Sequence, residues 1–188
     1  MNCVIIQILR RKVSEKMGRN KNLADLSREQ LEELIEIYSK NWLAMDGVWF
    51  QSIERKYDMD EAVYHDVEAW KKFTVIEAKR IKKFLGLSER PGLEGLKKAL
   101  GLRFHANLND DEIIIDGNTL IYRSIDCRAQ SARKRKGMEM HPCKPVGCVE
   151  YAGFASAIDD RITCECLSCH PEITDDTCYC AWKFTLNE

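Results

Sequence analysis

The chain has 188 residues and a formal net charge of −1, with 45% hydrophobic and 31% charged residues. This length suits one domain with a substantial hydrophobic core, and the composition is ordinary for a globular protein. The near-neutral charge argues against a general nucleic-acid-binding protein, which usually carries a clear basic excess.

Residues 1–22 are predicted to be a flexible leader that precedes the folded part of the chain. Their apolar run, Val4–Leu9, is too short for a signal-peptide core or a membrane span, and the basic residues follow it instead of preceding it. No other stretch is apolar enough to cross a membrane. We therefore expect a cytoplasmic protein that makes no membrane contact.

Residues 25–100 are predicted to be helical. The first helix begins at Ser27, which forms a capping box with Gln30, and its apolar residues recur at helical spacing. A second helix, DMDEAVYHDVEAWKKFTVIEAKRIKKFLG, opens with acids and closes with bases and Gly86, which suits the helix dipole. A break at Pro91-Gly92 precedes a short third helix over about 93–100.

From residue 103 the period of the apolar residues changes to two, which predicts strands. The runs RFHANLN, EIIID and NTLIYRSIDC are predicted strands, with a turn at Asp116-Gly117-Asn118. Residues 128–136 are predicted to form a short helix or a basic loop, GCVEYAGFASAID a helix, and RITCEC and CYCAWKFTL the last two strands. The predicted fold class is α+β, a single domain over 23–188. Its helical part covers 25–100, and its sheet and metal-site part, an antiparallel sheet with an inserted helix, covers 103–187.

Cysteines are concentrated near the C-terminus, where eight of the nine fall between Cys127 and Cys180. Reducing thiol pools disfavour disulfides in the cytoplasm, so clustered cysteines there more often bind metal. A C-x-x-C pair can bind one ion through a tight turn, and strand pairing would bring a third thiol close. The predicted ligands are Cys143, Cys166, Cys169 and Cys180, with Cys127 in reserve and His141 and His170 as substitutes. Zinc is the expected metal; an iron–sulfur cluster uses the same ligands, and buried packing thiols are the alternative to both.

Several motifs in this region carry a family resemblance. The runs DCRAQSARKRKG, CKPVG, YAGFASAIDDRI, CLSCHP and CYCAWKF resemble a family of uncharacterised cytosolic proteins from anaerobic bacteria and archaea, over about residues 25–186. More distantly, the order of Cys143 with Gly147, Cys169 and Cys180 resembles the 4-vinyl reductase domain. That resemblance implies a small α+β ligand-binding fold, often with a zinc site. The layout is also similar to that of the aminothiazoline-carboxylate hydrolase family.

The first helix carries a candidate ligand site. Trp42, Asp46 and Trp49 share one helical face, so the carboxylate is expected among large apolar side chains. A buried carboxylate needs a partner or takes up a proton, which makes Asp46, and more weakly Glu77, candidate acid/base residues. The alternative for Asp46 is a capping residue at a kink before Gly47.

The basic run RKRK, residues 133–136, lies between the first two cysteines of the cluster. It predicts a site for an anionic ligand, with Arg133 giving bidentate contact to a carboxylate. The alternative is a solvated helix face, which is the commonest fate of such runs. No aromatic residue is interleaved with the run, so nucleic-acid binding is disfavoured.

Two functions compete on this evidence. The first is a zinc-binding, small-molecule-binding domain, a sensor or accessory protein with a structural metal; four thiolates close the coordination sphere and disfavour zinc hydrolysis. The second is a small-molecule hydrolase of the aminothiazoline-carboxylate hydrolase type, with a free Cys143 as nucleophile activated by Arg133 or His141. An iron–sulfur protein is a third candidate. The sequence leaves the ligand open and allows a homodimer.

Overall fold

A computed structural model describes residues 21–188, and of Lys21 it describes the backbone alone. The chain divides into two compact units, residues 1–38 and residues 39–188. The predicted leader, residues 1–22, lies outside the described residues except for its last two positions, and the predicted domain boundaries stay a prediction.

The described part of the first unit is helical. The 3-10 helix η1 (Lys21–Asp25) precedes the long helix α2 (Arg28–Lys56), which continues from this unit into the second. The start of α2 confirms the predicted capping box, because the Ser27 backbone N–H donates to Gln30 Oε1 and the Gln30 N–H donates to Ser27 Oγ. The two bonds satisfy backbone donors that have no partner within the helix.

The helical half of the second unit follows the prediction closely. It comprises the rest of α2, then α3 (Met59–Leu85) and α4 (Gly92–Leu100). Asp58 caps the N-terminus of α3 by accepting from the Glu61 N–H at 2.8 Å. Gly86 ends α3 in the left-handed conformation, at a φ of 63°, which glycine adopts without steric cost.

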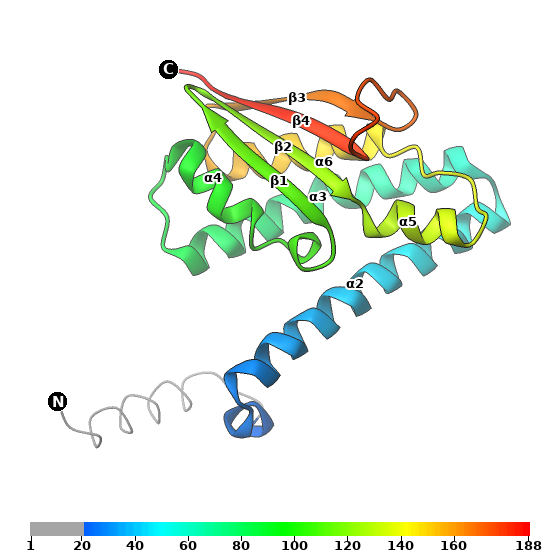
Figure 1. Cartoon of the computed structure of the whole chain (residues 1–188), viewed down its shortest axis with the longest axis horizontal. Helices are drawn as coiled ribbons and strands as arrows, with labels where there is room; N and C mark the ends of the chain where they lie inside the picture. Colours follow the sequence, from blue (N-terminus) through cyan, green and yellow to red (C-terminus); the bar gives the residue numbers. More distant parts are fainter. Residues whose placement is uncertain (1–20) are drawn as a thin grey trace. The chain divides into compact units, whose positions relative to one another are not determined.

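The second unit also contains a four-stranded antiparallel sheet, which confirms the predicted α+β class. The strands are β1 (Asp110–Asp116), β2 (Thr119–Asp126), β3 (Ile162–Cys169) and β4 (Cys180–Leu186). Their order is β1-β2-β4-β3, so the last strand lies between the hairpin and β3 (Figure 1). The hairpin turn falls at the predicted position, with Gly117 at a φ of 57°.

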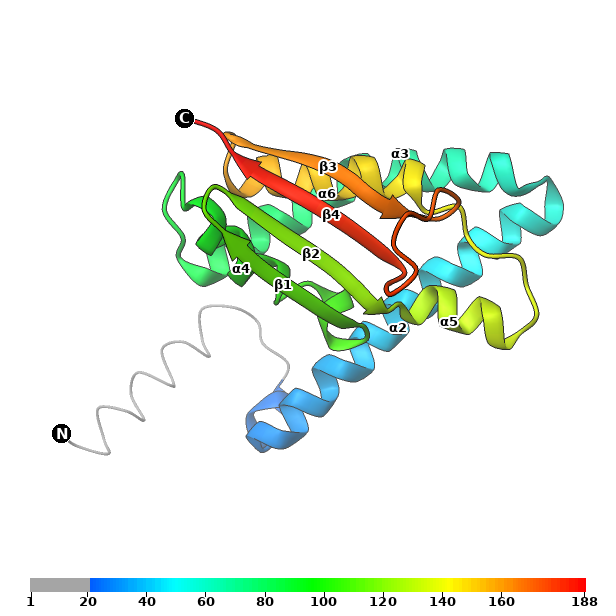
Figure 2. The same cartoon turned by 45° about the horizontal axis from the view of Figure 1, so that its top comes forward.

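Two helices separate β2 from β3 in the chain, where the sequence predicted one helix and a segment of helix or loop. They are α5 (Arg128–Arg135) and α6 (Lys144–Ile158). Helix α6 packs against β3 on one side and against α3 on the other, so it lies between the sheet and α3 (Figure 2). Close approach to the sheet requires Gly147, because a Cβ there would lie 2.4 Å from the ring of Trp182.

The strand predicted over RFHANLN, residues 103–109, was wrong. The 3-10 helix η2 (Phe104–Asn107) occupies this segment. Arg103 is buried, with 2% of its surface exposed, and Nε donates to Glu77 Oε2 at 2.9 Å. Phe104 and His105 stack on the ring of Trp70 from α3. Contacts with α3 therefore override the alternating pattern of the segment.

Candidate functional site

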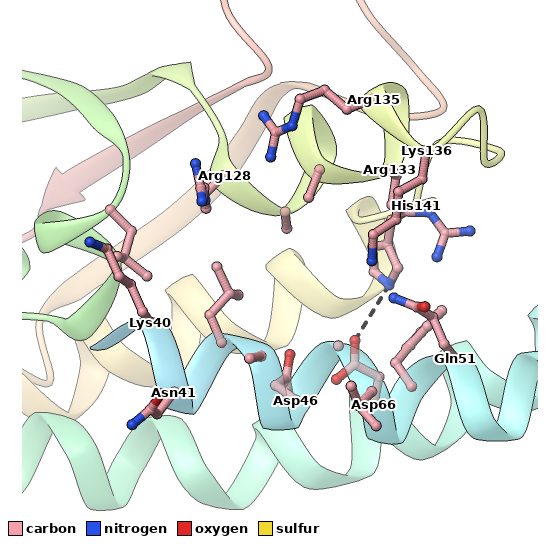
Figure 3. A pocket seen from close by; sticks show the side chains of 18 residues that line it. Lys40, Asn41, Asp46, Gln51, Asp66, Arg128, Arg133, Arg135, Lys136 and His141 are labelled. Atoms are coloured by element: carbon pink, nitrogen blue, oxygen red, sulfur yellow. Dashed lines mark ion pairs between the residues drawn. The ribbon is translucent and has the colours of Figure 1, made fainter. Parts of the chain in front are cut away.

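A pocket of about 490 Å³, here called the outer pocket, is lined by several charged residues. Its walls come from α2, between Lys40 and Gln51, and from α5, between Arg128 and Lys136. Asp66 of α3 and His141 also line it (Figure 3). This volume lies within the usual range for small-molecule sites.

One side of the outer pocket is cationic. Arg128, Arg135 and Lys136 line it, are exposed, and form no salt bridge with any residue in the described part of the chain. Arg128 and Arg135 share one face of α5, because a spacing of seven residues is close to two helical turns, and Lys136 follows directly at the end of the helix. Figure 3 shows these three side chains across the pocket from Asp46 and Asp66.

Asp46 lies on the opposite wall and is half-buried. Burial raises the pKa of this carboxyl from its usual value to about 7, and the negative charges of Asp66 and Glu150 add to the effect. The positive charge of His141 opposes the shift. The predicted kink at Asp46-Gly47 is absent, since α2 continues through both residues. Asp46 therefore offers the pocket a carboxyl group that can change its protonation state near neutral pH.

A second hollow of about 120 Å³, here called the thiol cavity, adjoins the outer pocket. The two share part of their lining, including Asp46, Asp66 and His141. Four cysteines line the thiol cavity, namely Cys127, Cys143, Cys169 and Cys180. None of these four lines the outer pocket.

Cys143 has the densest polar surroundings of these four thiols. It occupies the N-cap position of α6, and its Sγ lies 3.0 Å from His141 Nδ1. Gln130 Nε2 donates to the same sulfur at 2.9 Å. Gln130 also donates to the His141 carbonyl at 2.7 Å and accepts from the His141 N–H at 3.0 Å. The two bonds to the His141 backbone hold the segment before α6 in place. They also orient the amide of buried Gln130 so that its NH₂ group faces the Cys143 sulfur.

The other ring nitrogen of His141 faces Asp66. Nε2 lies 3.5 Å from Asp66 Oδ2, the pair drawn with a dashed line in Figure 3. The edge of the Phe50 ring packs on the imidazole with 4.5 Å between ring centroids. Residues from α2, α3 and the segment before α6 therefore hold one imidazole between a thiol and a carboxylate.

The strand thiols form a short series next to Cys143. Cys169 lies opposite Cys180 in the β3–β4 register, and a bulge between Cys166 and Ser168 precedes it. Hydrogen bonding to Cys143 is the largest cause that raises the pKa of Cys169 well above its usual range. Hydrogen bonding to Cys169, followed by burial, does the same for the pKa of Cys180. Cys169 therefore interacts with one thiol on each side.

The predicted ligand set is only partly assembled. Cys143, Cys169 and Cys180 line one cavity, together with the reserve ligand Cys127, whereas Cys166 does not line it. Burial raises the pKa of Cys127 and of Cys166 to about 11. Between residues 21 and 188, no group of three or more His, Cys, Asp or Glu side chains is arranged to hold a metal ion. The metal site stays a prediction.

The other predicted site residues have different surroundings. Arg133 lines the outer pocket, but its guanidinium is paired with Glu54 through contacts of 3.0 and 2.6 Å. Trp42 stacks on Phe73, and neither Trp42 nor Trp49 lines the outer pocket or the thiol cavity. Glu77 lies outside both hollows, in its buried ion pair with Arg103. Of the residues predicted on α2, only Asp46 faces the site.

Two residues of the site went unrecognised in the sequence, Asp66 and Gln130. Asp66 is one of many acids on α3, and nothing in the helical pattern separates it from the solvated ones. Gln130 lies in a strongly basic segment and is buried in the structure. The only hint in the sequence was that this residue is uncharged while most of its neighbours are basic. The basic run itself did indicate the cationic wall, although Arg128, Arg135 and Lys136 face the pocket while Arg133 is paired.

These features define an α+β protein with an open charged pocket backed by a thiol-lined cavity. Residues 22–186 match the model of a family of unknown function, DUF6125, and the chain belongs to this family. Membership of an uncharacterised family is thereby confirmed, while the likeness to 4-vinyl reductase and the range of organisms stay predictions. No curated protein matches the chain. None of the helices in the described range is long and apolar enough to cross a membrane.

Proposed function

We propose that this protein binds a small organic anion with an apolar body in the outer pocket. The observation that carries the proposal is the cationic wall of α5, where Arg128, Arg135 and Lys136 have no ionic partner among residues 21–188. Guanidinium groups bind carboxylates in a bidentate manner, and positive charges that gather on one wall and form no salt bridge favour an anion there. A ligand-binding role of this kind suits a sensor or an accessory protein.

The remaining lining supports an apolar ligand body. The lining also includes apolar residues of both helices, namely Leu43, Val48 and Phe50 of α2 and Ala129 and Ala132 of α5. Small-molecule sites commonly combine apolar walls with a few polar groups that fix the orientation of the ligand. The carboxyl groups of Asp46 and Asp66 on the far wall would repel an anion, so the acidic group of the ligand would point to α5.

The test uses 8-anilinonaphthalene-1-sulfonate, an apolar ring system with one sulfonate, as a fluorescent probe. Its dissociation constant should rise about fivefold in Arg128→Gln and again in Arg135→Gln, which corresponds to about 1 kcal/mol for each partly exposed ion pair. Lys134→Gln is the matched control, because this exposed residue of the same helix does not line the pocket. Simple aromatic carboxylates should displace the probe.

A neutral probe, N-phenyl-1-naphthylamine, separates charge recognition from apolar adsorption, and its affinity should be the same in all three variants. If the affinity for the sulfonate probe fell equally in Lys134→Gln and Arg128→Gln, the overall charge of the protein, and not the pocket, would be what attracts anions. Unchanged binding in Arg128→Gln and Arg135→Gln would refute the proposal outright.

Zinc binding stays a prediction that no contact described above decides. Cys169 interacts with both Cys143 and Cys180, which are zinc-ligand types, but Cys166 lies apart from their cavity. Elemental mass spectrometry of protein purified without oxygen would settle the metal content. The sequence predicts about one zinc per chain by analogy with single structural sites. The same holds for an iron–sulfur cluster, which would give visible absorption.

A further inference from the structure

We propose that Cys143 is a catalytic nucleophile, with His141 as its proton acceptor and Asp66 as the residue that positions His141. The distance from Sγ to Nδ1 is 3.0 Å, and that from Nε2 to Asp66 Oδ2 is 3.5 Å. A nucleophile, a base within hydrogen-bonding reach and a third group that orients the base are the parts that covalent catalysis requires. The proposal extends beyond ligand binding to a reaction.

Hydrogen-bond donors converge on the sulfur of Cys143. Gln130 Nε2 donates to it at 2.9 Å, and the Cys169 thiol interacts with it from the strand side. The Cys143 sulfur also lies 3.3 Å from the His141 carbonyl oxygen, to which its thiol can donate. Cys143 also lies at the N-cap of a 15-residue helix, where the helix dipole favours negative charge.

The neighbouring thiols are held in their neutral form. Burial raises the pKa of Cys127 to about 11, and contacts among thiols raise that of Cys169 and Cys180 further. Cys169 therefore stays protonated at neutral pH, and its S–H group can donate toward Cys143, while Cys180 interacts with Cys169. The thiol cavity thus contains one thiol beside a base and three that resist ionisation.

The reaction that these residues support is hydrolysis of an ester or an amide. The Cys143 thiol transfers its proton to His141 Nδ1, and the sulfur attacks the acyl carbon to form a thioester. The bond from the acyl carbon to the leaving oxygen or nitrogen breaks, and the leaving group takes the proton from His141. Water, losing a proton to His141, then attacks the thioester and releases the carboxylic acid and the free thiol. One water is consumed and no redox partner is needed.

The substrate class follows from the adjoining pocket, and this step rests on the proposed anion binding. The thiol cavity of about 120 Å³ has room for a small acyl group, whereas the outer pocket of about 490 Å³ can hold the rest. His141 lines both hollows and marks the position of the scissile bond. We expect a small ester or amide that also carries a negatively charged group.

The first experiment measures alkylation of the full chain by iodoacetamide at pH 6, with peptide mapping by mass spectrometry. At this pH an ordinary thiol is about 0.3% ionised, so an ion-paired thiolate has a large advantage even after its lower intrinsic nucleophilicity is counted. Cys143 should react at least about tenfold faster than Cys148. Cys148 is the internal control because it is the exposed thiol of the same helix, whereas Cys143 is half-buried.

The second experiment follows acyl transfer from p-nitrophenyl acetate. One acetyl group should appear on Cys143 after an acid quench, and a burst of p-nitrophenol should precede slow turnover. Cys143→Ala should abolish both, and Cys148→Ala should change neither. In His141→Ala, added imidazole should restore the burst, because a small base can occupy the space of the lost ring. Asp66→Asn should slow acylation about tenfold or more, and Asp66→Glu should recover part of it; a purely structural role predicts no such recovery.

Three results would overturn the proposal. Slower alkylation of Cys143 than of Cys148 in the wild-type chain would show that the thiol is not activated, whatever the variants do. Acetylation elsewhere, with none on Cys143, would place any esterase activity outside this site. Protection of Cys143 that a chelator relieves, with about one metal ion per chain, would assign the thiol to a metal site instead. None of these results changes the sulfonate-probe test of the outer pocket.

Discussion

Replacing Gly147 by alanine should destabilise the protein by pushing α6 away from the sheet. The added Cβ would lie 2.4 and 2.7 Å from two ring carbons of Trp182, whereas ordinary contacts of this kind are 3.4–4 Å. Trp182 is 1% exposed and lies within the sheet, with Tyr151 stacked on it at 4.7 Å between centroids. Because the Trp182 ring is buried and packed against Tyr151, it cannot rotate away from the added Cβ. Helix α6 therefore has to move.

Two opposing effects set the magnitude of this change. Overpacking a well-packed core costs about 1–3 kcal/mol, and a shift of about 1 Å against a rigid ring belongs at the upper end of that range. Alanine is favoured over glycine within a helix by about 1 kcal/mol. The net loss in the free energy of unfolding should therefore be about 2 kcal/mol, which corresponds to a fall in Tm of about 4–8 °C.

Gly47→Ala is the matched control for this substitution. Gly47 also lies inside a helix, α2, but the nearest atom to its added Cβ is Gln51 Nε2 at 3.8 Å. Only the helix-propensity gain applies there, so the variant should be about 0.5–1 kcal/mol more stable than the wild type. Urea unfolding followed by circular dichroism would measure both. If Gly147→Ala were as stable as Gly47→Ala, the close packing of α6 on Trp182 would be refuted.

Two further predictions concern buried charges. Arg103→Met should cost about 3–5 kcal/mol in urea unfolding, since it leaves Glu77 and Glu150 buried without a counter-charge. Adding Glu77→Gln and Glu150→Gln to it should recover most of that loss, and failure to do so would assign the cost to packing instead. The pKa of Asp46 is raised to about 7, so the native state holds a proton that the unfolded chain releases near its usual, lower pKa. Stability is therefore lost as the pH rises from about 4 to 7, and Asp46→Asn should gain stability relative to wild type at pH 8 but little at pH 4; an equal difference at both would contradict this.

The fold was predictable where the signals are local. The capping box at Ser27, the bases and Gly86 at the end of α3, and the turn at Gly117 each satisfy a backbone requirement of their own segment. The segment over residues 103–109 failed because its conformation depends on distant partners. Arg103 turns inward to Glu77, and no alternation within seven residues reports that contact.

The site was less predictable, because its residues meet only through tertiary packing. Asp66, Gln130 and His141 come from α3, α5 and the segment before α6, and no spacing in the sequence links them. The bulge after Cys166 is a second reason. It inserts one residue into β3, so that Cys169 lies opposite Cys180, where regular pairing from Cys166 onward would have placed Ser168. Strict alternation would have put Cys166 and Cys169 on opposite faces of the strand.

Cys143 is both a predicted metal ligand and the proposed nucleophile, and the two roles use the same sulfur atom. A metal ion and an acyl carbon both take the lone pair of the thiolate, so one sulfur cannot serve both at once. Gln130 and His141 approach the sulfur as hydrogen-bond partners, which is the arrangement that the proposed nucleophile requires. A zinc site would instead use this sulfur with the other thiols of the cavity, Cys127, Cys169 and Cys180. Alkylation of Cys143 with and without a chelator therefore decides between the two chemistries on a single atom.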